Sequence, residues 1–168
     1  MPFYLTETDV VSKVVDSQSV LIVPCRFCPA ASLSVSSNGP YFEFLRRVLK
    51  TASYERFVNG LKNKLEKKGI KTDVFRSKLL HQFVLCMWTS RRRKQLSETA
   101  RKYDALVVLG CDAAVYTVRE SCKSSACRVI QGMRSEGIMN VKPRLDWPCN
   151  LSLDLESVTP YECRAELT

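Results

Sequence analysis

Two short, uninterrupted apolar runs constrain the fold of this chain more than any other feature of its sequence. The stretch SVLIV covers residues 19–23, and the stretch DALVVLGC covers residues 104–111. Such runs are typical of strands that are covered on both faces, as in a parallel sheet. Because segments with helical periodicity lie between the strand-like segments, the sequence predicts a three-layer, Rossmann-like α/β domain with a mainly parallel sheet.

Periodicity and turn residues predict the other elements and the domain organisation. Helices are expected at residues 5–17, 42–49, 53–69, 90–103 and 112–122, and further strands at 70–77 and 127–133. Beyond Gly137 the pattern loosens and three prolines follow. The sequence therefore predicts an α/β cysteine-rich domain over residues 1–137 and an extended C-terminal tail over residues 138–168, which packs on the body or on a partner.

Export and membrane signals bear on how the eight cysteines are interpreted. No apolar run approaches the roughly 18 residues of a membrane span. The N-terminal stretch has early acidic residues and no secretory core, so a cytoplasmic location is expected. In that compartment the cysteines favour metal binding or redox chemistry over a disulfide framework. His81 is the one histidine in the sequence, which excludes any mechanism that needs two histidines from this chain.

Three apolar segments end in a cysteine, at Cys25, Cys86 and Cys111, and Cys28 follows the first of them in a Cys-x-x-Cys pattern. The carboxyl ends of parallel strands share one edge of a sheet, and sites form in the crevice outside that edge. If the three segments are neighbouring parallel strands, the four thiols converge. Four thiols suit a tetrahedral Zn²⁺ ion or an iron–sulfur cluster. The sequence thus predicts a metal site, with the choice between zinc and an iron–sulfur cluster left open.

Two other interpretations of the same cysteines stay open. Buried free cysteines often pack as small apolar side chains. A redox dithiol formed by Cys25 and Cys28 is the second alternative. The remaining cysteines have no spacing that assigns them a role; they are Cys122, Cys127, Cys149 and Cys163.

The formal net charge of +9 indicates an anionic partner, such as a protein with an acidic face. Arg91, Arg92 and Arg93 follow Cys86 closely and are candidate contacts for an anion or for that partner, although a solvated helix face explains them equally well. Trp88 is a candidate shield of the metal site, or else a core residue. Basic and aromatic residues do not interleave as they do in single-strand binders, so nucleic acid is not an expected partner.

The segments that carry these cysteines resemble a known family. VLIVPCRFCPA at residues 20–30, paired with CMWTSRRRKQLSETARKYDALVVLGCDAAVYTVRE at residues 86–120, is similar to the cysteine-rich domain of methylenetetrahydrofolate-reductase-associated proteins, which are accessory subunits of anaerobic one-carbon metabolism. The similarity extends over about residues 19–133. The chain departs from the family pattern at Ser32, near which the family often has a further cysteine, and at Asp112, where glycine is usual.

This resemblance implies an accessory metal-binding protein of methyl-group metabolism, with a structural or electron-transfer role in a complex. The partner would be a reductase or methyltransferase subunit, and any flavin chemistry would belong to that partner. The alternative from a different class is an enzyme: a small thiol oxidoreductase or methyl-transfer protein that uses Cys25 or Cys28 as its nucleophile. Whether the chain is itself an enzyme stays open, with an accessory subunit the favoured interpretation.

Overall fold

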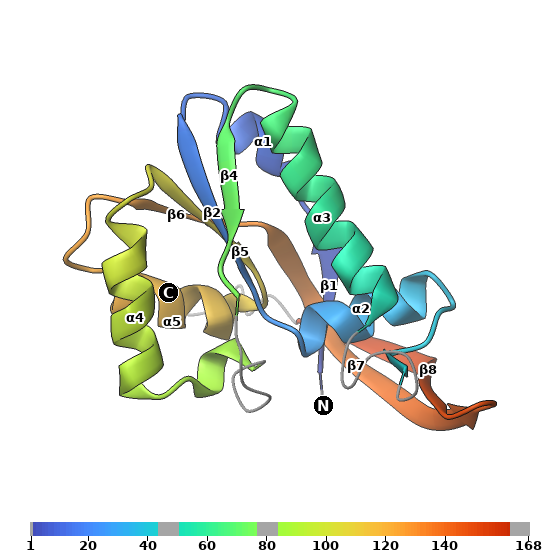
Figure 1. Cartoon of the computed structure of the whole chain (residues 1–168). Coiled ribbons are helices and arrows are strands. Elements are labelled where there is room, and N and C mark those ends of the chain that lie inside the picture. The colour runs from blue at the N-terminus through green and yellow to red at the C-terminus, as the bar shows by residue number, and fades with distance from the viewer. Residues whose placement is uncertain (1, 44–50, 77–83, 162–168) are drawn as a thin grey trace, which may run out of the picture.

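The computed structural model of the chain describes residues 2–43, 51–76 and 84–161 (Figure 1). The strands of this part form two four-stranded sheets. One is parallel, with the strand order β4-β2-β5-β6, and the other is antiparallel, with the order β1-β7-β8-β3. The elements in chain order are β1 (Phe3–Glu7), α1 (Val10–Lys13), β2 (Ser19–Pro24), α2 (Cys28–Ser36), β3 (Phe42–Glu43), α3 (Ala52–Glu66), β4 (Lys71–Val74), the short 3-10 helix η2 (Leu85–Met87), α4 (Ser90–Ala100), β5 (Ala105–Leu109), α5 (Asp112–Ser121), β6 (Arg128–Gln131), β7 (Met133–Asp146) and β8 (Asn150–Pro160).

Strands β2 and β5 form the centre of the parallel sheet. Every residue of β5 is buried, and so is every residue of β2 after Ser19. Their backbones pair in parallel from Val20 with Ala105 to Pro24 with Leu109. Because both faces of these strands are covered, their sequences are apolar throughout rather than alternating. The two strands and the parallel sheet predicted from the apolar runs are confirmed.

The order of the parallel strands identifies the position at the sheet edge where ligands usually bind in sheets of this type. The chain passes from β2 to β4 on one side, and then from β4 across to β5 and β6 on the other side. Counted within this sheet alone, the order is 2-1-3-4, which is common in doubly wound α/β sheets. In such sheets ligands bind at the carboxyl ends of the two strands where the direction of progression reverses. Here those two strands are β2 and β5.

Amphipathic helices cover the parallel sheet. Helix α3 buries Tyr54, Val58, Leu61 and Leu65, which recur at helical spacing on one face. The chain turns after this helix at Gly69, whose φ of 80° is a conformation that favours glycine. In Figure 1, α3 lies on one side of the parallel strands, while α4 and α5, which pack against each other, lie on the other.

The C-terminal region differs from its prediction. Strands β7 and β8 form a long antiparallel hairpin, paired from Gly137 with Pro160 to Asp146 with Asn150, in place of an extended tail. The predicted boundary after residue 137 falls inside β7. Two features conceal this hairpin in the sequence. Much of it is solvent-exposed, which weakens the apolar alternation, and Pro143 lies within a strand, where proline is rare.

The N-terminal region also differs from its prediction. Residues 3–7 form β1, which pairs antiparallel with β7, and only Val10–Lys13 are helical. Since the partner strand lies more than a hundred residues away, no local pattern reveals this pairing. The helix expected over residues 42–49 is replaced at its start by β3, and residues 44–50 lie outside the described part of the chain.

Helix α2 joins the two sheets. It packs against β1 and β8 of the antiparallel sheet and against α3 beside the parallel one. Ser32, buried on this helix, accepts a hydrogen bond from the Leu5 backbone N–H (2.9 Å) and can donate to the Cys28 carbonyl oxygen (3.0 Å). The Ser32 side chain therefore ties α2 to β1.

Candidate thiol centre

Cys25 lies at the carboxyl end of β2, beside the end of β5. Its backbone N–H donates to the Leu109 carbonyl oxygen at 2.8 Å, which extends the strand pairing by one residue. Its side chain is buried, and its sulfur accepts a hydrogen bond from the Leu85 backbone N–H at 3.5 Å. Gly110 permits this close packing, because a Cβ atom there would lie 3.3 Å from the Cys25 Cβ and 2.6 Å from that of Ala114.

Cys28 and Cys111 form a hydrogen-bonded thiol pair. Cys28 is the first residue of α2, and Cys111 is the N-cap of α5 at the end of β5. Both are buried, with exposed fractions of 8% and 4%. A hydrogen bond between the two side chains lowers the pKa of Cys111 and raises that of Cys28. The pair therefore connects the first residues of two helices that follow the two central strands.

The pKa values of Cys111 and Cys28 are shifted in opposite directions. The pKa of Cys111 is well below that of an ordinary thiol, because its sulfur accepts the hydrogen bond from Cys28 and further ones from the backbone N–H groups of Ala113 and Ala114. These N–H groups belong to the first turn of α5, where the helix dipole also favours a negative charge. The pKa of Cys28 is raised, because its thiol donates that hydrogen bond and is buried. The hydrogen bond between the two side chains thus favours a negative charge on Cys111 over one on Cys28.

Backbone N–H groups point at each of the three buried sulfurs. In addition to the donors of Cys111, the Cys28 sulfur accepts from Phe3 on β1, and the Cys25 sulfur from Phe27. These hydrogen bonds favour the deprotonated forms. Burial opposes them and raises the pKa of Cys25 to about 11. The donors come from β1, η2, α5 and the residue before α2, so the centre depends on the packing of several elements.

Cys86 is placed differently from the other three cysteines. The sequence allowed the segment before Cys86 to be a strand or the end of a loop that leads to a helix. In the structure residues 85–87 form η2, which leads to α4, while residues 77–83 lie outside the described part. Cys86 is exposed. Its pKa is raised by partial burial and by the charge of Cys111, and Cys25 in turn responds to Cys86. Cys86 therefore lies within electrostatic range of two of the other thiols.

The four cysteines are chemically suited to a metal, but their side chains in the described structure do not form a complete set of ligands. Four thiols at one sheet edge are ligands that Zn²⁺ and iron–sulfur clusters prefer. Within residues 2–43, 51–76 and 84–161, no three histidine, cysteine or acidic side chains are grouped so that they could hold a metal ion as they stand. A four-cysteine site would therefore require the buried thiols to move closer to one another and the exposed Cys86 side chain to turn toward them.

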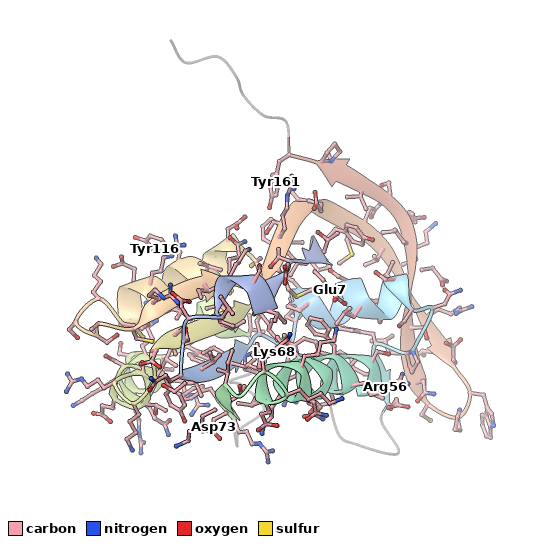
Figure 2. The ribbon with its side chains drawn as sticks, turned by 90° about the horizontal axis from the view of Figure 1, so that it is seen from above. Glu7, Arg56, Lys68, Asp73, Tyr116 and Tyr161 are labelled. Atoms are coloured by element: carbon pink, nitrogen blue, oxygen red, sulfur yellow. The ribbon has the colours of Figure 1, made fainter. Side chains whose placement is uncertain are left out.

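The antiparallel sheet contributes an aromatic cover that the sequence did not indicate. Tyr161, just beyond β8 in Figure 2, packs its ring 6.0 Å from that of Phe3. The pKa of Tyr161 is raised, first by burial and then by the charges of Asp112, Cys111 and Cys28. Tyr41 and Tyr54 are also buried within electrostatic range of the thiols. These tyrosines reach the centre through long-range packing, for which the sequence carries no local signal.

Arg92 and Trp88 form a packed unit rather than a surface for a partner. The Arg92 guanidinium carbon lies 4.2 Å from the centre of the Phe75 ring and 5.2 Å from that of Trp88. One Arg92 nitrogen donates to the Arg76 carbonyl oxygen at 2.7 Å. Arg92 is buried and packed on aromatic rings, so it does not present an exposed surface to a partner. Trp88 is buried as well and packs on Phe75 at 5.5 Å.

The other two arginines are more accessible. Arg91 is exposed, whereas Arg93 is half-buried and donates from Nε to the Trp88 carbonyl oxygen at 3.2 Å. Replacing Arg92 with alanine is expected to lower the free energy of unfolding by about 1–3 kcal/mol, because the cation–π and hydrogen-bonding contacts are lost. The change is measured by urea denaturation. Arg91→Ala is the matched control and should shift stability by no more than about 0.5 kcal/mol; equal effects would show that Arg92 is not a packing residue.

The cysteines left without a role in the sequence lie away from this centre or outside the described residues. Cys122 is buried, and its charge contributes to the raised pKa of Cys127, which is about 11 and is due mainly to burial. Cys149 is exposed at the turn between β7 and β8. Cys163 and His81 belong to the segments that the structure does not describe. All cysteines in the described part are free thiols.

Comparison of the chain with models of known protein families, with curated proteins and with solved structures finds no match. Among the helices of the described residues, none combines the length and the apolar character needed to cross a membrane.

Proposed function

We propose that the chain is an accessory metal-binding protein in which Cys25, Cys28, Cys86 and Cys111 hold zinc or an iron–sulfur cluster. The observation that carries this proposal is the set of backbone N–H groups directed at three buried sulfurs at the carboxyl ends of β2 and β5. Such donors favour thiolates, the form in which cysteine binds metals. The position also coincides with the preferred ligand site of doubly wound sheets.

Burial favours a metal centre over thiol catalysis. A catalytic cysteine must be reached by its substrate, and reactive cysteines are partly exposed. Cys25 and Cys111 are only 2% and 4% exposed. A buried thiolate is costly to desolvate unless a cation or hydrogen bonds compensate it, and a bound metal provides that cation. Bound zinc would supply a structural crosslink between α2, η2 and α5, whereas a cluster would supply a one-electron carrier.

The chain's own residues prepare the site. Helix α5 holds the Cys111 sulfur as a thiolate through the N–H groups of Ala113 and Ala114. Cys28 keeps its proton, which would leave to solvent when a metal binds. Cys86 lies on a three-residue 3-10 helix, so its side chain can turn without disturbing a long element. Because the cysteines lie on α2, η2 and at the ends of β2 and β5, binding of a metal would couple the packing of these elements.

The biological setting of the proposal rests on the resemblance to methylenetetrahydrofolate-reductase-associated proteins and on charge. The setting is a structural or electron-transfer role within a complex of anaerobic one-carbon metabolism, in the cytoplasm. The net charge of +9 supports a reductase or methyltransferase subunit with an acidic face as the partner, and exposed Arg91 supports its docking on α4. A three-layer Rossmann-like arrangement is part of this proposal; the helices on both sides of the parallel strands support it.

The deciding experiment is purification of the full chain under anaerobic conditions without a metal-binding tag. Metal is then measured by elemental analysis, and the visible absorption spectrum is recorded. Zinc at a one-to-one ratio with the chain is expected for a structural site, and iron and sulfide with broad visible absorption are expected for a cluster. Protein that contains neither metal, and that takes up neither when reconstituted, would refute the proposal.

A dithiol function is the second candidate, because Cys28 and Cys111 are already hydrogen-bonded to each other. The structure thus pairs Cys28 with Cys111, whereas the sequence suggested Cys25 and Cys28. In this function the Cys111 thiolate attacks a disulfide substrate and Cys28 resolves the mixed disulfide. As the pair becomes a disulfide, its two electrons and the Cys28 proton pass to the two substrate thiols, which take their second proton from solvent. The candidate requires one cysteine of the metal-free protein to react with an alkylating reagent much faster than the others. Equal, slow alkylation would exclude it.

A further inference from the structure

A polar hollow of about 220 Å³ lies at the carboxyl ends of β2 and β4. Strand β4 is the neighbour of β2 on the side away from β5, so the hollow opens at the sheet edge where ligands of doubly wound sheets bind. One face of α3, which packs against β4 in Figure 1, forms its other wall. The polar side chains that line the hollow belong to Arg26, Arg76, Glu55 and Asn59. Three segments that are distant in the sequence therefore bring charged and polar groups to one opening.

The two arginines of the hollow occupy equivalent places on neighbouring strands. Strand β2 ends at Pro24 and β4 ends at Val74, so Arg26 and Arg76 each follow a strand end by two residues. Because β2 and β4 pair in parallel, both ends lie at the same edge of the sheet. Parallel pairing thus places two cations at one opening, where their mutual repulsion favours the binding of an anion.

Contacts within the chain hold both arginines in place. Arg26 Nη1 lies 2.7 Å from Glu55 Oε1, and the two side chains are only 27% and 24% exposed. This ion pair orients the guanidinium while using few of its five N–H groups, and the others can donate to a ligand. At Arg76 the backbone is held, because its carbonyl oxygen accepts from the buried Arg92 side chain at 2.7 Å. The side chain of Arg76 is exposed. One cation is therefore oriented in advance, and the other extends from a fixed point.

The lining groups suit a phosphate ester better than a carboxylate. A phosphate monoester carries a charge of about −1.5 to −2 at neutral pH and has three terminal oxygens, so it can accept hydrogen bonds from two guanidinium groups at once. A carboxylate has two oxygens, which a single arginine satisfies. The hollow also has room for more than a bare ion, because one water molecule needs only about 10–15 Å³ by the same measure. On the α3 wall, Glu55 and Asn59 provide acceptors for hydroxyl groups.

We propose that this hollow binds a small phosphate monoester with a hydroxylated organic part. Arg26 and Arg76 donate hydrogen bonds to its phosphate oxygens. Glu55 and Asn59 accept hydrogen bonds from its hydroxyl groups. The net charge of +9 attracts such an anion to the protein, and the hollow gives it a defined place. The inference does not depend on the metal centre, because none of the described cysteines lines the hollow.

The test is a calorimetric titration of the full chain with glycerol phosphate, in the presence of a metal chelator. Arg76→Gln is expected to lower the affinity about 10–100-fold, since losing a hydrogen bond to a charged group has an effect of that size. Its melting temperature should match that of the wild type, because the Arg76 side chain is exposed and its held carbonyl group is kept. Arg56→Gln is the matched control. Arg56 is exposed on α3, as Figure 2 shows, but does not line the hollow, so this variant should bind like the wild type.

Two further titrations identify which part of the ligand each wall binds. Glycerol without phosphate should not bind, and equal binding of glycerol and glycerol phosphate would overturn the assignment of a phosphate. Asn59→Ala should weaken the binding of glycerol phosphate but not that of inorganic phosphate, and equal losses for both would overturn the role of Asn59.

The inference as a whole has two refuting outcomes. One is a wild-type chain that binds neither glycerol phosphate nor inorganic phosphate. The other is an equal loss of affinity in Arg76→Gln and Arg56→Gln, which would mean that the anion is attracted by the net charge of the protein rather than held in the hollow. Neither outcome bears on the thiol centre, because metal content is measured in a separate experiment.

Discussion

Replacing Cys111 with serine is expected to weaken Zn²⁺ binding by more than about 100-fold, which exceeds the usual effect of losing a group that only supports a ligand. Cys111 carries the largest expected effect because it is the thiol that the fold already holds as a thiolate, through Cys28 and the first turn of α5. A serine hydroxyl stays protonated at neutral pH and cannot replace a thiolate as a ligand. The measurement is competition with a chelator under anaerobic conditions.

The matched control is Cys149→Ser, because Cys149 is exposed at the hairpin turn far from the centre in sequence. It should bind Zn²⁺ like the wild type. The wild-type affinity should also fall as the pH is lowered, because the raised pKa values of Cys25 and Cys28 mean that a metal must displace their protons. Equal binding by the Cys111 and Cys149 variants would remove Cys111 from the ligand set.

Replacing Leu106 with alanine is expected to lower the free energy of unfolding by about 2–5 kcal/mol. Leu106 is fully buried in β5, where it pairs with Leu21 on one side and Val129 on the other. The substitution removes apolar surface and leaves a cavity at the centre of the parallel sheet, which the neighbouring strands cannot close without breaking their pairing. Urea denaturation of the metal-free protein measures the change without a contribution from bound metal.

Leu145→Ala provides the control for this prediction. Leu145 lies in β7 and is 78% exposed, so the same change in side chain should alter stability by no more than about 0.5 kcal/mol. A loss as large as that of Leu106→Ala would mean that the hairpin surface around Leu145 is buried in solution. A small loss in both variants would mean that β5 is not the centre of the core.

The sequence by itself determined the parallel half of the molecule. The apolar runs of β2 and β5 identify strands buried on both faces, because only a strand without a solvent side lacks polar alternation. The amphipathic spacing of α3 likewise identifies its buried face. Since parallel strands end at one edge, the positions of Cys25 and Cys111 in the sequence were enough to predict that they lie side by side.

Tertiary structure alone decided the antiparallel sheet and the details of the thiol centre. Strand β1 pairs with β7 across the whole chain, and the exposed hairpin of β7 and β8 has too little buried surface to show an alternating pattern. The hydrogen bond of Cys28 is to Cys111, which lies 83 positions further along the sequence, and not to Cys25 in the same Cys-x-x-Cys pattern. The sequence also gives no sign that the buried hydroxyls of Tyr41 and Tyr54 lack a hydrogen-bond partner within the described residues. Hydrophobic periodicity within one segment indicates whether a residue is buried. Which buried residues contact one another depends on how distant segments pack, and no periodic pattern in the sequence indicates that packing.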